Sequence, residues 1–324
     1  MMKAITGLSP ISGRLFFSVL KTLYAIRKWG SIMFNFSYKK QRTLILIGFL
    51  TVPVALLLVL SYYPALSLVY YSFTDWTGIG WDMNWVGFAN YKEIFTRPEI
   101  FSSFKVNAYY FIGGLAQTAL ALFFAVILSG KLKGRNVFRA ILFLPYVLHS
   151  VATVIMFKNV YHMEYGSLNI FLGAIGLDAW QQSWLGNEHL VNFSLAFISM
   201  WKFMGLSMII FIGALQSIPG DMYESARIDG ANSWQQFRYL TLPSIRSVLN
   251  LQLILTLTGA LAAFEIPYVM MLGANGTSTF VIQTVDTAFK FQKAGLASAM
   301  GVVLMLIVIV IILIQRKLLP GGED

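Results

Sequence analysis

Six apolar stretches, each long enough to cross a lipid bilayer, constrain this chain more than any other feature of its sequence. A membrane-spanning helix needs about 20 mostly apolar residues. Only 12% of the residues are charged, about half the share found in soluble domains. The sequence therefore predicts an all-α polytopic membrane protein. The six expected spans lie at about 44–72, 107–130, 138–161, 190–217, 246–271 and 295–315.

The distribution of Lys and Arg predicts the orientation of these spans. Cytoplasmic segments of membrane proteins carry an excess of both residues. With the N-terminus inside, the inner segments hold seventeen of them and the outer loops hold five. Both ends and the polar segment 218–245 are thus expected in the cytoplasm. The net charge of +10 follows from this topology, and nucleic-acid binding is not inferred from it.

The two ends of the chain lie outside the expected spans. Residues 1–43 precede the first span, and within them 11–36 mixes Leu, Phe and Tyr with Arg and Lys. This pattern favours a helix lying on the inner membrane surface, with a disordered basic leader as the alternative. Residues 317–324 form a short cytoplasmic tail.

The polar segment from Gln216 to Pro243 is patterned as two short helices around a glycine. Asp221 is placed to cap the first helix, with Glu224 as its reciprocal partner three residues later. Asp229 and Gly230 end this helix, because glycine accepts the left-handed backbone conformation without steric cost.

The second short helix follows directly. Ser233 is placed to cap it, with Gln236 as the partner in a capping box, and Leu242-Pro243 is expected to stop it. The pattern therefore predicts a compact helix–turn–helix at the membrane surface, shaped for docking to another protein.

This hairpin resembles the Glu-Ala-Ala loop of permease subunits in ABC importers, a loop that docks on the ATPase subunits. The spacing and the residue types match over about twenty positions; the one departure is Ser225, which is small enough for close packing. The alternative is a solvent-exposed helical hairpin that matches this pattern by chance. The matching residues are Glu224, Ser225, Ala226, Asp229, Gly230, Ala231, Phe237, Leu242 and Pro243.

Motifs elsewhere extend the resemblance over about 44–316 and narrow it to the carbohydrate-type branch, similar to maltose and glycerol-phosphate permeases. These motifs are Tyr71–Trp76, Val86–Tyr91, Arg139–Pro145, Gly213–Pro219, Ala263–Tyr268 and Gly295–Ala299. The resemblance implies a six-helix permease core beside a second homologous permease subunit. It also implies two ATPase subunits that bind ATP and Mg²⁺, an external solute-binding protein and alternating access driven by the hairpin. An alginate fragment is one substrate that it admits, and the location would be the bacterial inner membrane.

Catalytic and metal chemistry is not indicated for this chain. It lacks the Gly-rich phosphate loop of ATPases, so it is not expected to hydrolyse ATP or to bind a cofactor. It has no cysteine, which excludes thiol chemistry. His149, His162 and His189 are scattered without ligand spacing, and we interpret them as structural or loop residues.

The sugar pathway is sought among polar residues inside the spans, because an intramembrane charge needs a cavity or a partner. Lys202 and Glu265 are the charged candidates. Lys202 follows Trp201, which could stack on a sugar ring, but it could also snorkel to the outer interface. Glu265 lies near Tyr268, and it could instead make a helix–helix hydrogen bond. Weaker candidates are Asn250, Gln252 and Gln117, since polar residues often simply join helices.

Two other classes of membrane protein remain to be separated from an importer subunit. A secondary transporter would show internal symmetry between its halves, and we find no convincing repeat. A scaffold or a channel would not need the hairpin motif. Uptake driven by ATP in the presence of ATPase subunits separates the importer subunit from both of these classes.

Overall fold

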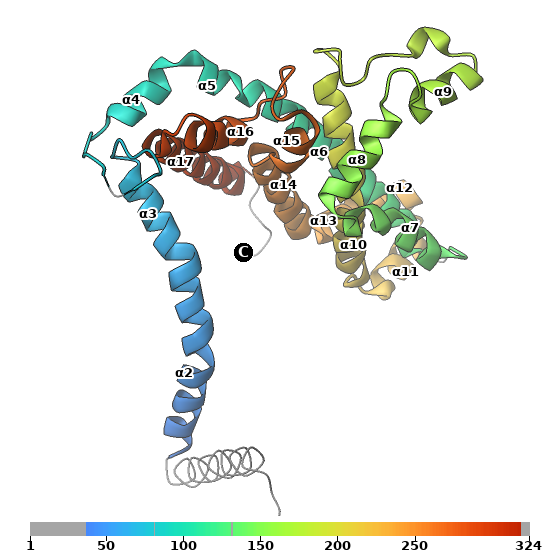
Figure 1. Cartoon of the computed structure of the whole chain (residues 1–324). Helices are drawn as coiled ribbons and strands as arrows, with labels where there is room; N and C mark the ends of the chain where they lie inside the picture. The colour runs from blue at the N-terminus through green and yellow to red at the C-terminus, as the bar shows by residue number, and fades with distance from the viewer. Residues whose placement is uncertain (1–36, 81, 131, 319–324) are drawn as a thin grey trace, which may run out of the picture. The chain divides into compact units, whose positions relative to one another are not determined.

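The computed structural model of this chain is all-helical, as the sequence predicts (Figure 1). It describes residues 37–80, 82–130 and 132–318. The expected surface helix at 11–36 and the residues of the tail after 318 lie outside these ranges. Among the described residues no β-strand forms, and one isolated bridge joins Thr74 to Trp85.

The helices vary from single turns to long apolar rods. Their bounds are α2 Tyr38–Leu57, η1 Leu58–Tyr62, α3 Tyr63–Tyr71, α4 Ala89–Thr96, α5 Pro98–Ser102, α6 Phe104–Ser129, α7 Arg135–Val147, α8 Ser150–Val160, α9 Ser167–Ala174, η2 Asp178–Trp180, α10 Val191–Gln216, α11 Gly220–Ile228, α12 Ser233–Gln236, η3 Phe237–Thr241, α13 Leu242–Ser244, α14 Arg246–Leu261, α15 Glu265–Met271, α16 Phe280–Val285, η4 Asp286–Lys290 and α17 Ala294–Leu318.

Five helical segments of the described chain are long and apolar enough to cross a membrane, and a bent pair makes up to six. The five segments are Tyr38–Tyr71, Pro98–Ser129, Val191–Gln216, Arg246–Met271 and Ala294–Leu318. The pair α7 and α8 turns by 99° between its two helices. Each expected span therefore contains a helix, but the third is broken rather than straight.

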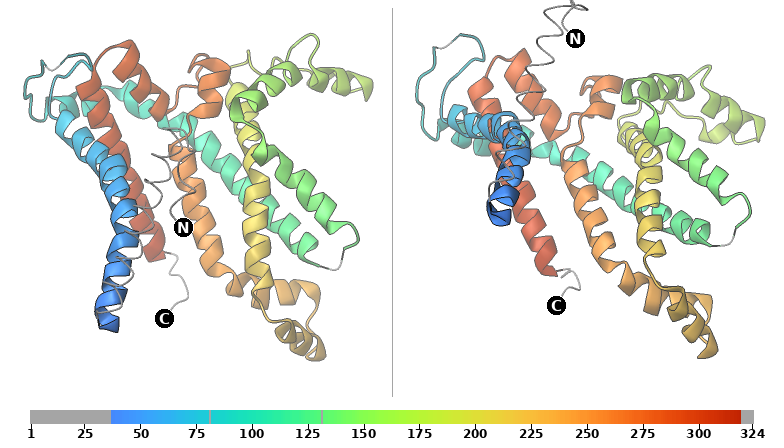
Figure 2. Two further views of the ribbon diagram at one scale, coloured as in Figure 1. Left: turned by 60° about the horizontal axis from the view of Figure 1, so that its bottom comes forward. Right: turned by 90° about the horizontal axis from the view of Figure 1, so that it is seen from below.

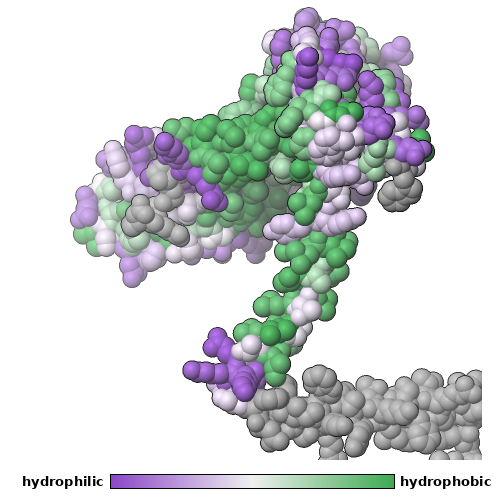
Figure 3. Space-filling view, turned by 90° about the vertical axis from the view of Figure 1, so that its left-hand side faces the viewer, coloured by the Kyte–Doolittle hydropathy of each residue, from purple (hydrophilic) through white to green (hydrophobic). Residues whose placement is uncertain are grey.

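Residues up to Ser67 form a unit of their own, separate from Leu68 onward. None of the described side chains in this first unit is buried. Figure 3 shows apolar side chains along the helix, down to a hydrophilic patch at the end that carries Lys39, Lys40 and Arg42. An apolar helix of this length is typical of a segment that lies in lipid or against another helix.

Within this helix a π-helical turn, η1, precedes Pro64. Proline has no backbone N–H to donate to the residue four positions earlier. The wider turn lets the backbone pass the proline without ending the helix.

The second unit is built around α6, which packs against both α10 and α14, while α10 also packs against α7. Figure 2 shows these long helices beside one another in two views. Ala121, Met208, Phe211 and Ile245 are almost fully buried in one of the clusters between them. Small residues such as Ala121 let helices approach closely where hydrophobic driving force between them is absent.

The break between α14 and α15, inside the fifth expected span, is stabilised by a polar side chain from α6. Asn107, 3% exposed, donates from its amide nitrogen to the carbonyl oxygens of Ala260 and Leu261, where α14 ends. Its amide oxygen accepts from the N–H of Phe280 at the start of α16. One asparagine therefore joins the end of α14 to the start of α16 through backbone groups of both. Helix ends are where backbone groups need such partners.

Three sequence motifs that lie far apart along the chain meet at one end of the second unit. Asn90 donates from its side-chain amide to the carbonyl oxygens of Ser72 and Thr74, and Ser72 also bonds to the Tyr91 hydroxyl at 2.7 Å. The N–H of Gly295, at the start of α17, donates to the Trp76 carbonyl oxygen. These buried bonds fix the segment after α3 against the last span.

Candidate functional site

The hairpin between α10 and α14 folds as two short helices around Gly230. The backbone of Gly230 has a φ of +82°, which an L-residue adopts only with strain. Its N–H donates to the Arg227 carbonyl oxygen, and the N–H of Ala231 donates to that of Ala226. This pair of bonds is a Schellman motif, which closes the end of α11.

The two arms of the hairpin are also joined by side chains. The hydroxyls of Tyr223 on α11 and Thr241 in η3 hydrogen-bond at 2.9 Å, and Thr241 is only 5% exposed. Gln236 donates from its side chain to the Ala231 carbonyl oxygen. The hairpin is therefore braced as one piece by contacts within itself.

The expected start of α11 is wrong in one respect. Pro219 is the N-cap residue, and no side chain caps this end. Asp221 lies instead in the first turn, where its negative charge favours the positive end of the helix dipole. The backbone of Pro219 is extended, with φ −59° and ψ 134°, and its ring has no polar atom that could cap the helix.

The expected start of the second helix is shifted by one residue. Asn232, not Ser233, is the cap: its side-chain oxygen accepts from the N–H of Gln235, whose side chain accepts from the N–H of Asn232. Asn232 has an extended backbone, with ψ 169°, so it is the last residue before the helix and its side chain can reach forward to the first turn. Ser233 is already inside the helix.

Pro243 does not stop the second helix as expected. The helical path runs through the π-turn η3 and on to Ser244, and it breaks at Ile245. As at Pro64, the wide turn ahead of the proline accommodates its missing N–H.

The residues of the resemblance lie together on this hairpin. Glu224, Ser225, Asp229 and Gly230 are exposed, whereas Ala226 and Ala231 are half-buried at the turn. Apolar side chains are exposed as well: Ile228 is 86%, Tyr239 68% and Trp234 66% exposed. Exposed aromatic and aliphatic side chains around a charged helix are typical of a protein-docking surface.

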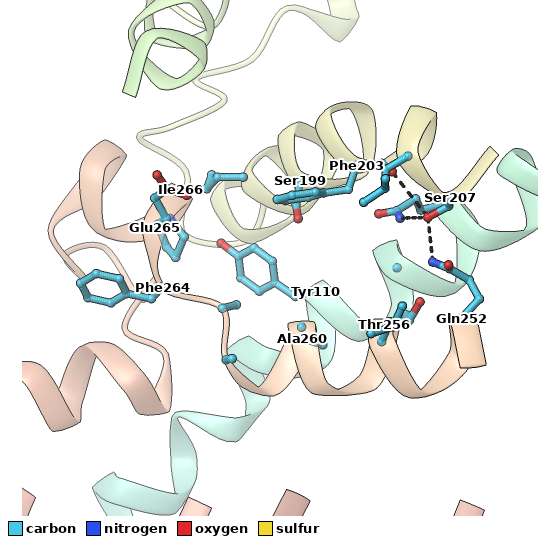
Figure 4. Close-up of a pocket in the computed structure, with 18 of the residues that line it drawn as sticks. Tyr110, Ser199, Phe203, Ser207, Gln252, Thr256, Ala260, Phe264, Glu265 and Ile266 are labelled. Atoms are coloured by element: carbon cyan, nitrogen blue, oxygen red, sulfur yellow. Dashed lines mark hydrogen bonds between the residues drawn. The ribbon is translucent and has the colours of Figure 1, made fainter. Parts of the chain in front are cut away.

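A cavity of about 400 Å³ lies among α6, α10, α14 and the segment that joins α14 to α15. That volume is within the usual range for small-molecule sites. Figure 4 shows Tyr110 reaching from α6 into the space between Ser199 on α10 and the segment Phe264–Ile266. The Tyr110 ring is 6% exposed, and its hydroxyl has no hydrogen-bond partner.

Three polar side chains from three helices meet in the wall of this cavity (Figure 4). Gln117 on α6 and Gln252 on α14 both donate to the hydroxyl oxygen of Ser207 on α10, at 3.0 and 2.7 Å. The carbonyl oxygen of the Gln252 side chain has no partner. An unpaired buried group of this kind costs about 1–3 kcal/mol, which a hydroxylated solute could recover.

The charged pathway candidates have different surroundings. Glu265, at the start of α15, lies at the cavity and is exposed. Lys202 does not line the cavity. It is 4% exposed, and its ammonium donates to the Leu148 carbonyl oxygen, which is freed where α7 bends into α8. A side chain this buried does not fit the snorkelling alternative.

Of the other expected pathway residues, Gln117 and Gln252 line the cavity, whereas Trp201, Tyr268 and Asn250 do not. Trp201 packs edge-on against Phe157, and Tyr268 stacks on Phe264 at 4.7 Å. The backbone carbonyl oxygen of Asn250 accepts from Gln315. A pathway role for these residues stays a prediction.

The cavity residues that sequence reasoning missed carry a readable signal. Tyr110 and Gly114 recur at helical spacing with Gln117, which the sequence had already indicated as a weaker candidate, and Ser199, Phe203 and Ser207 do the same on α10. Polar or small residues spaced three or four apart in an apolar span mark one face of a helix. Sequence reasoning named Gln117 and Gln252, but it weighed charge above spacing and so missed the other residues of these faces.

The fold and these two features define a multi-pass membrane protein with a cavity among its long helices and an exposed helical hairpin. The family model "Binding-protein-dependent transport system inner membrane component" matches residues 98–321. The chain therefore belongs to this family of inner-membrane transport components.

Named relatives agree with this family. The chain is 32% identical to the probable ABC transporter permease protein YurN of Bacillus subtilis, over 84% of this chain and 95% of that protein. It is 31% identical to the multiple sugar-binding transport system permease protein MsmF of Streptococcus mutans, over 83% and 93%.

A solved structure shows the same fold. A chain in the crystal structure of a bacterial alginate ABC transporter, in complex with an alginate pentasaccharide-bound periplasmic protein, matches with a TM-score of 0.75. The match covers 86% of this chain and 94% of that one at 21% identity. At this identity the likeness concerns the fold and not the substrate.

Proposed function

We propose that this chain is a permease subunit of an ABC importer for a sugar or oligosaccharide. Together with a second homologous permease it would form the pathway for a solute that a binding protein delivers. The observation that carries this proposal is the exposed, internally braced hairpin between α10 and α14. Relatives over most of the chain are named as sugar transport permeases, which supports the substrate class.

In this proposal the hairpin transmits the motion of the ATPase subunits. Its arms are held together by the Schellman turn and by the bond between Tyr223 and Thr241, so it can move as a rigid lever. Glu224 is exposed and can pair with a basic residue of the ATPase. ATP and Mg²⁺ would be bound and used in those partner subunits.

The cavity would be part of the sugar pathway. Its unpaired Tyr110 hydroxyl and Gln252 carbonyl oxygen would bond to sugar hydroxyls, and Phe203 and Phe264 would contact the apolar face of a ring. Alternating access would open this cavity to either side of the membrane in turn. The hairpin and both ends of the chain would lie on the cytoplasmic side, as the excess of Lys and Arg predicts.

Purification and reconstitution test this proposal. The isolated chain should show no ATPase activity. Co-expressed with its partners, it should purify with one second permease and two ATPase copies, and vesicles holding the complex should accumulate sugar only with ATP and the binding protein. ATP hydrolysis by the chain alone, or equal uptake without ATP, would contradict the proposal, the latter in favour of a secondary transporter or a channel.

A further inference from the structure

The charge of the cavity wall points to the chemical class of the transported sugar. We infer that the cavity accepts uncharged saccharides and disfavours uronates, an inference that rests on the proposed function. Among the described residues that line it, Glu265 is the one charged side chain, and neither Lys, Arg nor His is present. A carboxylate solute would find no cation in this part of the wall.

The nearby cation of α10 is already engaged. Lys202 points its ammonium to the Leu148 carbonyl oxygen at the bend between α7 and α8, and it is nearly fully buried. Withdrawing it would leave a backbone acceptor and a buried charge without partners, which is costly. The structure therefore gives Lys202 a bracing contact at the bend and no contact with the cavity.

The polar side chains that line the cavity suit hydroxyls. The Tyr110 hydroxyl and the Gln252 carbonyl oxygen are buried without partners, and Ser199 and Thr256 add further hydroxyls to the lining. These groups donate and accept without carrying charge, as sugar hydroxyls also do. Phe203 and Phe264 supply the apolar surface that most ligand sites combine with a few polar groups.

A uronate would meet two penalties at this wall. Its carboxylate would lose hydration without gaining a charged partner, and it would approach Glu265, a like charge. The cavity is thus suited to a neutral oligosaccharide, and the acidic sugar admitted by the sequence resemblance fits it poorly.

Protection of a cavity cysteine from labelling, measured in the whole complex, reports on sugar binding in the cavity itself. It does not depend on which sugar the binding protein selects. The chain has no native cysteine, so Ser199→Cys places a single thiol on this subunit at the cavity wall. In nanodiscs holding the full complex, labelling by a charged maleimide is measured with maltotriose or with trigalacturonate present. Ala262→Cys, an exposed position on the same lining, is the second probe should the first variant fail to assemble.

Maltotriose should slow labelling at concentrations at which trigalacturonate does not. Adding Glu265→Gln should improve protection by trigalacturonate about tenfold, equivalent to ~1.4 kcal/mol. Glu164→Gln removes a carboxylate from an exposed loop position outside the lining and should leave both protections unchanged.

Equal protection by the two sugars, or stronger protection by trigalacturonate, would overturn the inference. Protection by neither sugar would also overturn it, because the cavity would then not be a sugar site. ATP-driven uptake by the same complex reports on the proposed function separately, so the two can fail independently.

Discussion

The hairpin and the cavity are built from contacts of different range along the chain. Every bond that braces the hairpin joins residues within Pro219–Ile245, such as the pair Tyr223 and Thr241, which are 18 positions apart. In the cavity wall, Ser207 joins Gln117 and Gln252, which are 90 and 45 positions away. The hairpin is therefore determined by local sequence, and the cavity depends on how three spans pack.

This difference predicts different responses to substitution. A change in the hairpin should act on coupling and leave the helices of the membrane core in place. A change at a helix contact beside the cavity should lower the stability of the whole second unit. Three experiments test the contrast, and a fourth tests a local contact outside both regions.

Replacing the glycine of the turn should have the largest effect. In Gly230→Pro the ring fixes φ near −65°, which is incompatible with the observed +82°, and the bond to Arg227 is lost. ATP-driven uptake in vesicles should fall to background while the protein remains in the membrane. Gly230→Ala should cost only the strain of a left-handed backbone, about 1–2 kcal/mol. No steric clash adds to this cost, because a Cβ at Gly230 meets no atom within 4 Å.

Glu224→Ala should have a smaller effect on the same hairpin. It removes an exposed charge without disturbing the turn, so it should weaken retention of the ATPase subunits on an affinity column rather than abolish uptake. Normal uptake by both Gly230→Pro and Glu224→Ala would show that the hairpin is not the lever.

The second experiment compares two glycines that both line the cavity. A Cβ at Gly114 would lie 2.5 Å from Thr256 Cγ2, whereas one at Gly259 would meet nothing within 4 Å. The Thr256 hydroxyl is bonded to Thr118, so this side chain cannot rotate away freely. Gly114→Ala should lower the melting temperature of the complex through about 1–3 kcal/mol of overpacking.

Gly259→Ala is the matched control, because the same methyl group is added where there is room. Replacing glycine by alanine within a helix is favourable by about 0.5–1 kcal/mol, so this variant should melt at the native temperature or slightly above it. Equal melting of the two variants would mean that α6 and α14 are not in close contact at Gly114.

The third experiment distinguishes the two possible caps of α12. Asn232→Ala should destabilise the hairpin by about 1 kcal/mol, seen as faster hydrogen exchange across α12 and η3. Ser233→Ala should change exchange little, because Ser233 lies inside the helix. Faster exchange in Ser233→Ala than in Asn232→Ala would show that Ser233 is the cap, as expected from the sequence.

The smallest effect concerns a local contact outside the spans. The Asp75 carboxylate accepts from the Asn84 backbone N–H at 2.6 Å and from its side-chain amide at 3.0 Å. These bonds lower the pKa of Asp75 below its ordinary value of 3.8. Because the folded pKa is depressed, the stabilisation is present above the unfolded pKa and is lost as the pH falls through the folded one.

The segment between Asp75 and Asn84 should therefore loosen only below about pH 4. A spin label on Ile79→Cys, an exposed position in this segment, should become more mobile there. The added change Asp75→Asn should give the mobile spectrum already at pH 7. A label equally immobile in both proteins at every pH would exclude this contribution of Asp75.

Sequence reasoning succeeded where the determinant is composition or a short pattern. The all-helical class follows from apolar runs, and the turn at Gly230 follows from a single glycine after Asp229. It erred by one residue at Ser233, because Asn232 and Ser233 are both good caps and only the backbone shows which residue is still extended. It also expected proline to end a helix at Pro243, where a π-turn carries the helix past it.

The pathway shows the limit of that reasoning most clearly. As residues inside spans, Lys202 and Glu265 look alike, since both are charges in an apolar setting. The helix bend at Leu148 supplies a partner for the lysine, and the break before α15 places the glutamate at the cavity.

The sequence by itself determined the number and extent of the apolar segments, the family and the hairpin with its glycine turn, because these depend on composition or on contacts within about 30 residues. Only the tertiary structure decided that α7 and α8 bend apart, that Asn107 joins α6 to the end of α14, and that Ser207 joins Gln117 to Gln252. The physical reason is that a polar group in an apolar span must find a partner, and which partner it finds depends on the packing of helices that are distant in sequence.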